Sequence, residues 1–209
     1  MSKNNVLAIA RAELGNTEVP ANSNRTKYGL AYGLDGQPWC AMFLWWIFWM
    51  AGESAAFCGG QRVASCGAIK RYYQAQGRWV TGGYQPCDIV ILNFSGTQDT
   101  EHCGIIETVN TNGTITTIEG NTSPGSEGSQ DNGGCVARKQ RYLSNVIGAG
   151  RPAYSIEMPS DVPTGHWGVD AIRYCLSEGY MVGYPDGSFK PDTPITRAEL
   201  ASILFRIFG

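Results

Sequence analysis

The sequence predicts an α+β fold for residues 1–154 and a small helical module after them. Helical periodicities come first along the chain, β-branched runs joined by turns come next, and the pattern breaks near Tyr154. Helices followed by an antiparallel sheet are typical of α+β domains. The 209 residues suffice for one medium and one small domain. We therefore expect a domain at 1–154, a linker at 155–160 and a module at 161–209.

Three helices are predicted in the first half of the larger domain. Residues 3–14 place apolar side chains at helical spacing, and Gly15 follows as a stop signal. A second helix begins near Pro38 and is apolar on nearly every side, so we expect it at the centre of the domain. The third covers residues 63–76, with Gly77 at its end.

The sheet is predicted from apolar and β-branched runs in the second half. Residues 88–92 carry a continuous apolar run, as a strand covered on both faces would. The turn-forming residues 110–113 join two runs into a hairpin, and a loop rich in glycine and polar residues is expected at 120–134. The predicted strands cover residues 88–92, 102–109, 114–118, 136–143 and 146–150.

The C-terminal module is predicted to be helical. Residues 167–178 have a helical pattern that stops at Gly179, and residues 184–187 have the composition of a turn. The final helix begins with Thr196 as its cap and Glu199 three residues later, which is the capping-box pattern.

Composition argues against several classes of function. The formal net charge is −2 and basic tracts are absent, so we predict no nucleic-acid partner and no membrane partner. The apolar segment 41–51 is well short of the roughly 20 residues that cross a bilayer. The N-terminal segment is too short and too polar for a signal-peptide core, so we expect synthesis in a bacterial cytoplasm.

The seven cysteines occur without a CxxC pair or a Cys/His cluster at zinc-ligand spacing. Structural disulfides are not expected in a cytoplasmic protein. We therefore predict no metal site and no cofactor, and we interpret all cysteines but one as packing residues or spare thiols. These are Cys58, Cys66, Cys87, Cys103, Cys135 and Cys175.

The remaining cysteine and one of the two histidines suggest nucleophilic chemistry. Cys40 lies in the first turn of the apolar helix, where converging N–H groups favour a thiolate, although a buried packing role is the alternative. His102 begins a predicted strand and can serve as the proton-transfer partner that a thiolate needs, whereas His166 is far from Cys40 in the sequence. Glu119 and Asn121 project to the same face if extended, and either could orient the imidazole.

On these segments, residues 1–153 resemble the CHAP domain, the cysteine, histidine-dependent amidohydrolase/peptidase of bacterial and phage cell-wall lysis enzymes. The resemblance implies a papain-like fold and cleavage of an amide bond in peptidoglycan. The matching motifs are at residues 24–29, 38–41, 88–90, 102–105 and 119–121.

The resemblance also implies a role for each site residue. Cys40 is the nucleophile that forms a thioester, His102 the general base, and Glu119 the group that orients the imidazole, with Asn121 close by. The backbone N–H of Cys40 is expected to help bind the oxyanion. The bond that is cut stays open between the N-acetylmuramoyl–L-alanine amide and a bond within the stem peptide or cross-bridge.

The sequence does not identify a second oxyanion donor as clearly as it identifies the Cys40 N–H. Gln37 or Tyr28 could supply it, but turn polarity and packing explain these residues equally well.

The chain departs from the CHAP pattern at a few positions. Cys87 stands where a glycine usually precedes the strand, and Cys103 stands where a small apolar residue often follows the histidine. Some relatives bind calcium through an acidic loop ahead of the nucleophile. That region offers only Asp35 with Asn22 and Asn24 here, so we predict no calcium.

From Ser160 onward, the chain resembles a single S-layer homology (SLH) repeat, a helical module that binds secondary cell-wall polysaccharides. The matching motifs are at residues 160–162, 166–167, 171–172, 183–189 and 195–199. Arg197 offers a guanidinium group for an acidic sugar, or is a solvated surface residue. Trp167 and Tyr184 could stack against sugar rings or pack within the module.

SLH repeats usually occur in threes, whereas this chain has one. A lone short repeat buries little surface, so we expect three chains to associate through it as a homotrimer.

Together the two resemblances predict a phage-type endolysin, a peptidoglycan hydrolase that reaches the wall after release through holin-type pores. Two alternatives remain: a non-catalytic wall-binding protein, and a papain-like amidase or protease with a substrate other than murein.

Overall fold

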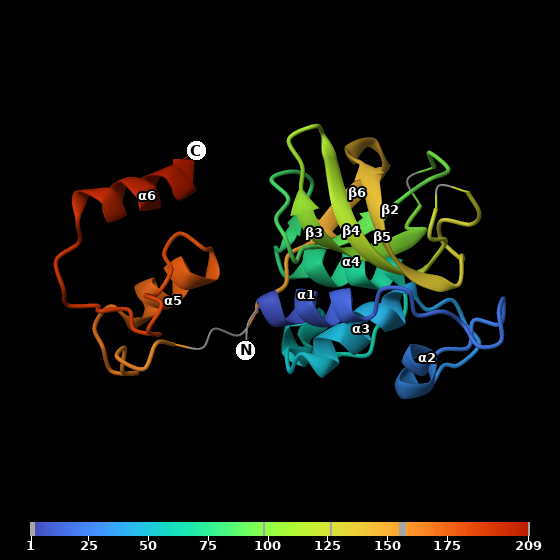
Figure 1. The fold of residues 1–209 in the computed structure, drawn as a ribbon, viewed down its shortest axis with the longest axis horizontal. Coiled ribbons are helices and arrows are strands. Elements are labelled where there is room, and N and C mark those ends of the chain that lie inside the picture. Colours follow the sequence, from blue (N-terminus) through green and yellow to red (C-terminus); the bar gives the residue numbers. More distant parts are fainter. Residues whose placement is uncertain (1–2, 98, 126, 155–157, 209) are drawn as a thin grey trace. The chain divides into compact units, whose positions relative to one another are not determined.

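The computed structural model divides the chain into two compact units, Met1–Tyr154 and Ser155–Gly209 (Figure 1). Part of the predicted linker, residues 155–157, lies outside the described residues. The structure describes residues 3–97, 99–125, 127–154 and 158–208.

The larger unit begins with helices, as the sequence predicts. The short helix α2 was not expected; the Thr26 side chain caps its N-terminus and Gly33, at φ 87°, ends it. Two short 3-10 turns, Ser54–Ala56 and Cys58–Gly60, follow α3. The helices are α1 (Lys3–Ala12), α2 (Lys27–Tyr32), α3 (Cys40–Met50) and α4 (Cys66–Ala75).

Helix α3 lies at the centre of this unit. Every residue from 40 to 48 is buried, because the segment carries apolar side chains around its whole circumference. The helix packs against α1 and α2 and against strands β3 (His102–Val109) and β4 (Thr114–Thr122). Burial of each large side chain contributes roughly 1.5–3 kcal/mol, so α3 is a rigid mount for any group at its start.

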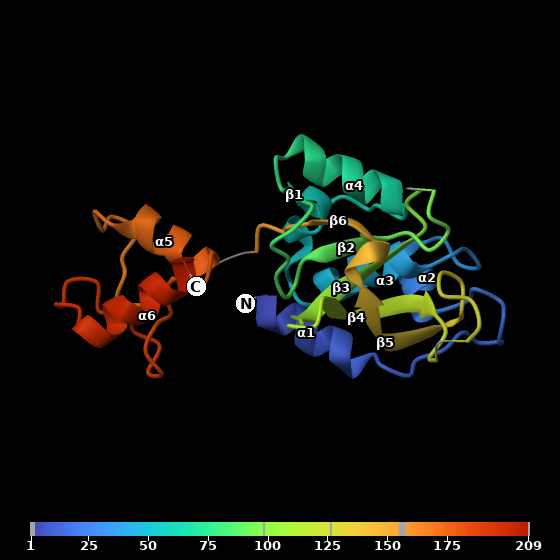
Figure 2. The ribbon, with the colours of Figure 1, turned by 90° about the horizontal axis from the view of Figure 1, so that it is seen from above.

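The helices precede a six-stranded antiparallel sheet with strand order β1-β6-β2-β3-β4-β5 (Figure 2). Figure 1 shows α1 and α3 below this sheet. The helices and one sheet face share a large apolar cluster, and Val90, Leu92, Ile106 and Ile115 form a smaller one. The other strands are β1 (Trp79–Val80), β2 (Ile89–Leu92), β5 (Cys135–Tyr142) and β6 (Val146–Gly150).

The smaller unit contains helices α5 (Val169–Ser177) and α6 (Arg197–Phe208). The predicted capping box forms: Thr196 Oγ1 accepts from Glu199 N–H at 3.2 Å, and Glu199 Oε2 accepts from Thr196 N–H at 2.8 Å. Neither of these two helices buries a residue.

The α+β prediction is confirmed: helices precede an antiparallel sheet, and a helical module follows. In the described part of the chain, no helix combines the length and the apolar character that a membrane span requires.

Candidate active site

Cys40 is the first residue of α3, and the residue before it fixes the start of the helix. Trp39 is fully buried, donates its indole N–H to Glu18 Oε1 at 3.1 Å and stacks on Tyr28 with ring centroids 5.2 Å apart. The Cys40 N–H lies among the first-turn donors that lack an intrahelical acceptor, as an oxyanion site requires. Its sulfur is therefore held at a positive helix end.

The two side chains proposed as a second oxyanion donor differ in their surroundings. The Tyr28 hydroxyl donates to Glu13 Oε2 at 2.6 Å within the core, so this hydroxyl is already engaged. Gln37 is exposed in the turn that leads into α3. Of these two residues, only Gln37 is still proposed as the second oxyanion donor.

The structure brings His102 and Glu119 together with Cys40. His102 starts β3 and Glu119 lies on β4, and His102 Nε2 is 3.0 Å from Glu119 Oε2 with both side chains fully buried. Neither ring nitrogen has a well-aligned hydrogen bond among the described residues, and the contact with the carboxylate is an ion pair when the ring is protonated. Nε2 is the nitrogen beside the carboxylate, and Nδ1 is the other ring nitrogen.

Two glycines permit this close approach. A Cβ atom at Gly104 would lie 2.6 Å from Glu119 Cγ and would displace the carboxylate. A Cβ atom at Gly120 would lie 2.6 Å from Phe43 Cβ, on the helix that carries Cys40. Any side chain at these two positions would push the carboxylate strand away from its partners.

Glu119 accepts hydrogen bonds from two neighbouring side chains. Arg141 donates from Nε to Oε1 at 2.9 Å and from Nη2 to Oε2 at 2.5 Å, and Thr117 donates to Oε1 at 2.5 Å. The Arg141 guanidinium also lies 4.7 Å over the Phe94 ring. Burial alone would raise the pKa of Glu119, but Arg141 and His102 lower it to about 2. These partners therefore favour the ionised form of the buried carboxylate.

Arg141 was not identified from the sequence, although its strand carries a signal. Alternate residues of β5 are buried, and this places Lys139 and Arg141 on the covered face. A charged residue on a covered face requires a partner of opposite charge. That rule could have pointed from Arg141 to the buried carboxylate of Glu119.

The charges of Cys40 and His102 favour an ion pair. The thiols of Cys103 and Cys66 hold the pKa of Cys40 well below its usual range, and His102 adds to this against the opposing effect of burial. Burial alone would lower the pKa of His102, but Cys40 and Glu119 raise it to about 9. Both pKa shifts favour the thiolate form of Cys40 and the imidazolium form of His102.

Asn121 corrects one expectation about this site. The idea that it shares a face with Glu119 assumed extended backbone, but its φ is 59°, and the register of β4 against β5 shifts between Glu119 and Thr122. Its Nδ2 donates to Asn132 Oδ1 at 3.0 Å. Glu119 is therefore the group at the imidazole, and a catalytic role for Asn121 stays a prediction.

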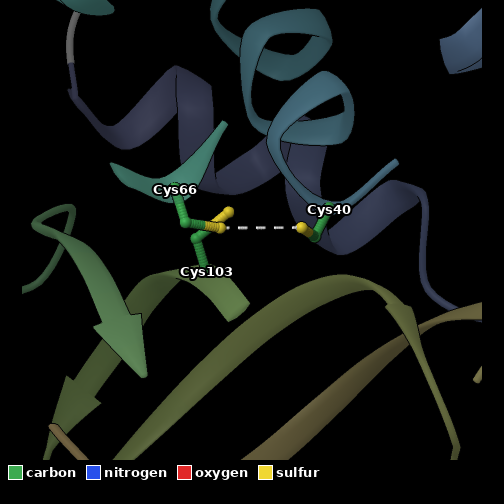
Figure 3. Close-up of side chains that lie close together, drawn as sticks. All are labelled: Cys40, Cys66 and Cys103. Atoms are coloured by element: carbon green, nitrogen blue, oxygen red, sulfur yellow. Dashed lines mark hydrogen bonds between the residues drawn. The ribbon is translucent and has the colours of Figure 1, made fainter. Parts of the chain in front are cut away.

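Two further thiols lie beside the Cys40 thiol (Figure 3). Cys66 begins α4 and Cys103 follows His102 on β3; the Cys40 and Cys66 sulfurs are 3.9 Å apart. All three sulfurs lie within 4.8 Å of one another. Packing alone is thus an incomplete explanation of Cys66 and Cys103, because both sulfurs lie close to that of Cys40.

The predicted wall-binding residues lie in the smaller unit. Trp167 is 87% exposed and stacks on His166, and Arg197 is exposed as the first residue of α6. The Tyr184 hydroxyl donates to Glu199 Oε1 at 2.8 Å, which ties that ring to the start of α6. Trp167 and Arg197 are therefore free to meet a ligand, whereas Tyr184 also has a structural role.

Family comparisons match both parts of the chain. Residues 32–121 match the CHAP domain, and residues 160–201 match the S-layer homology domain. The first match includes Cys40, His102 and Glu119, and the second includes Trp167 and Arg197.

Three curated relatives each match between 22% and 31% of the chain. Cell surface glycoprotein 1 of Acetivibrio thermocellus is 48% identical over 52 residues, 25% of this chain and 2% of that protein. The outer membrane protein SlpA of Deinococcus radiodurans is 40% identical over 70 residues, 31% of this chain and 6% of that protein. The cellulosome-anchoring protein of A. thermocellus is 44% identical over 46 residues, 22% of this chain and 10% of that protein. The chain thus spans a tenth or less of these relatives' length.

Solved structures resemble a larger share of the chain. The endolysin LysIME-EF1 has a TM-score of 0.48 at 15% identity and covers 76% of this chain and 67% of its own. Ly7917 has a TM-score of 0.43 at 20% identity and covers 73% of this chain and 62% of its own.

Proposed function

We propose that this chain, which carries a CHAP domain followed by an S-layer homology domain, is a peptidoglycan hydrolase that anchors itself to the cell wall. The observation that carries the proposal is the buried Cys40–His102–Glu119 cluster at the start of a rigid helix. The CHAP match independently covers these three residues.

The geometry supports acyl transfer through a thioester. The Cys40 thiolate attacks an amide carbonyl carbon, and the N–H of Cys40 donates to the oxygen as negative charge develops there. The His102 imidazolium gives its proton to the leaving amine, and the neutral ring then takes a proton from the water that hydrolyses the thioester. Glu119 holds the ring and stabilises its charge, and Arg141 holds Glu119.

The smaller unit would bind a secondary cell-wall polysaccharide. Arg197 presents a guanidinium group whose fork matches a carboxylate on an acidic sugar, and Trp167 presents an exposed aromatic face. Binding through this unit would concentrate the catalytic unit at its insoluble substrate.

A trimer formed through the smaller unit is part of the proposal. The smaller unit exposes more apolar side chains than a stable monomeric module would leave in contact with water. A second and a third copy of the chain could cover these side chains. Static light scattering of the full chain at micromolar concentration is expected to give a trimer mass; a monomer mass alone would contradict the proposal. The exposed apolar residues that further copies could cover include Val182, Ile195, Leu200, Leu204, Phe205, Ile207 and Phe208.

Digestion of purified peptidoglycan tests the catalytic part. The wild-type chain is expected to release fragments with new amino groups, and mass spectrometry of these fragments identifies the bond. Cys40→Ala should lower the rate by about 10⁴ or more, since loss of a nucleophile removes the covalent route. Cys58→Ala, at another buried cysteine, is the matched control and should stay active.

Each negative result has a definite meaning. Fragment release by Cys40→Ala at the wild-type rate would exclude the cysteine mechanism. Wall binding by the wild type without any fragment release would instead indicate a non-catalytic wall-binding protein.

A further inference from the structure

We propose that Cys40, Cys66 and Cys103 form a binding site for a thiophilic divalent metal ion such as Zn²⁺, and that the bound ion blocks the nucleophile. The binding itself does not depend on the proposed function; the inhibition does, because it concerns the sulfur that attacks the substrate.

The spacing of the sulfurs fits a zinc ion. Zinc binds thiolate sulfur at about 2.3 Å with tetrahedral angles, so two ligating sulfurs lie about 3.8 Å apart. The sulfurs of Cys40 and Cys66 are 3.9 Å apart, and all three sulfurs lie within 4.8 Å of one another. A shift of about 0.1 Å for the nearer pair, and of up to about 1 Å for the third sulfur, would complete the triangle.

The three sulfurs come from separate elements that the core holds in place. Cys40 starts α3, Cys66 starts α4 and Cys103 lies on β3, and at most 8% of any of these residues is exposed. Figure 3 shows the three side chains pointing toward one another from these elements. A site assembled in this way is preorganised, because little side-chain freedom is lost when the ion binds.

The donor set selects the class of ion. Three sulfurs without a carboxylate among them favour thiophilic ions, whereas Ca²⁺ and Mg²⁺ prefer oxygen ligands. Zinc would displace the thiol protons into solvent, and its fourth position would be left to water. A disulfide explains the cluster less well, because it needs sulfurs about 2.05 Å apart and would leave the third thiol without a role.

A zinc ion bound at the three sulfurs would prevent Cys40 from attacking the substrate. A Cys40 sulfur bonded to zinc has its electron pair in the metal bond and cannot attack a carbonyl carbon. The ion would act as a reversible inhibitor that a chelator removes.

Co²⁺ binding, followed by displacement with Zn²⁺, tests the site on the full chain kept reduced with a phosphine. We expect an intense thiolate-to-Co²⁺ charge-transfer absorption at one ion per chain, which Zn²⁺ abolishes. Cys66→Ser and Cys103→Ser should each weaken Zn²⁺ binding by about tenfold to hundredfold or more, since even groups that only support a metal site have effects of this size. Cys175→Ser, in the other unit, is the matched control and should bind as the wild type does.

Two results would overturn the proposal. One is a wild-type chain without a charge-transfer band, a result that does not depend on whether any variant folds. The other is a Zn²⁺ affinity in Cys66→Ser equal to that of the wild type.

A separate assay distinguishes this proposal from the proposed function. Zn²⁺ should stop release of peptidoglycan fragments and a chelator should restore it. A metal-free chain that binds Zn²⁺ but never releases fragments would refute the hydrolase and leave the metal site intact. Fragment release that persists with the site saturated by Zn²⁺ would refute the inhibition.

Discussion

The two units of this chain bury their side chains to opposite extents. In the larger unit, every residue from 40 to 48 on α3 is buried, whereas α5 and α6 of the smaller unit bury none. The larger unit can therefore exclude water from a charged cluster and fix its geometry. The smaller unit presents its side chains outward, as a surface that binds a polymer or further copies would.

Glu119 and Glu199 illustrate the same contrast between the two units. The pKa of Glu119 and that of Glu199 are both lowered to about 2, but for different reasons. Arg141 and His102 stabilise the charge of Glu119 against the cost of burial, whereas hydrogen bonds from Thr196 stabilise the partly exposed Glu199 at the start of α6. A low pKa therefore marks a buried charged cluster in one unit and a helix cap in the other.

Removal of the smaller unit tests whether wall binding belongs to this unit and hydrolysis to the larger one. It should have the largest effect of the changes considered, a loss of wall binding. Deleting residues 160–209 should weaken binding to whole cell walls by about 10²–10⁴-fold, the range that multivalent attachment supplies. Hydrolysis of short soluble wall peptides should change little. Sedimentation of the truncated and full-length chains with purified walls measures the first effect; equal binding would show that the larger unit itself holds the wall.

Removal of one buried charge tests the energetic contrast. Arg141→Met leaves Glu119 without its guanidinium partner, and loss of one member of a buried ion pair costs about 3–5 kcal/mol of unfolding free energy. Glu199→Gln, in the exposed capping box, is the matched variant and should have a much smaller effect. Denaturant titration followed by tryptophan fluorescence measures both, and equal losses would contradict the contrast.

The pH dependence should come from the larger unit. The folded pKa of His102, about 9, is above its ordinary value of 6.5, so its protonated form stabilises the fold below about pH 6.5, and this stabilisation is lost as pH rises through 9. Loss of the imidazolium also removes the acid that protonates the leaving amine. Peptidoglycan hydrolysis should therefore fall about tenfold per pH unit above 9. An alkaline limb near pH 6.5 would mean that Cys40 and Glu119 do not raise the pKa of His102.

The smallest predicted effect concerns polysaccharide recognition. Arg197→Gln should weaken binding of wall polysaccharide by about tenfold to hundredfold, since a charge-assisted hydrogen bond contributes about 1.5–3 kcal/mol. Lys190→Gln, at a nearby exposed cation in the same unit, is the control. Isothermal titration with wall polysaccharide compares the variants; equal effects would indicate general electrostatic attraction instead of a specific Arg197 contact.

The sequence predicted the parts of the fold that local pattern determines. The apolar helix at Cys40 and the strand at His102 follow from composition and periodicity. Asn121 was misplaced because a left-handed residue breaks the alternation of the strand, and this could not be read from residue types. Helix α2 was missed because it has only six residues.

The residues that surround the candidate site were harder to predict than Cys40, His102 and Glu119 themselves. The contact of Arg141 with Glu119 and that of Cys66 with Cys40 join residues that are distant in the sequence and depend on side-chain packing. Spacing rules for metal ligands also failed to identify the three-thiol cluster, because its cysteines come from three separate elements.

Alkylation of Cys40 as a function of pH tests the central claim most directly. The reduced chain is treated with iodoacetamide, and mass spectrometry measures the rate at each cysteine. Cys40 is expected to react as a thiolate well below pH 8, at a rate that His102→Ala lowers, whereas a free model thiol with a pKa of about 8.5 reacts little there. A Cys40 whose reactivity follows that of the free thiol across the pH range would contradict the thiolate–imidazolium pair.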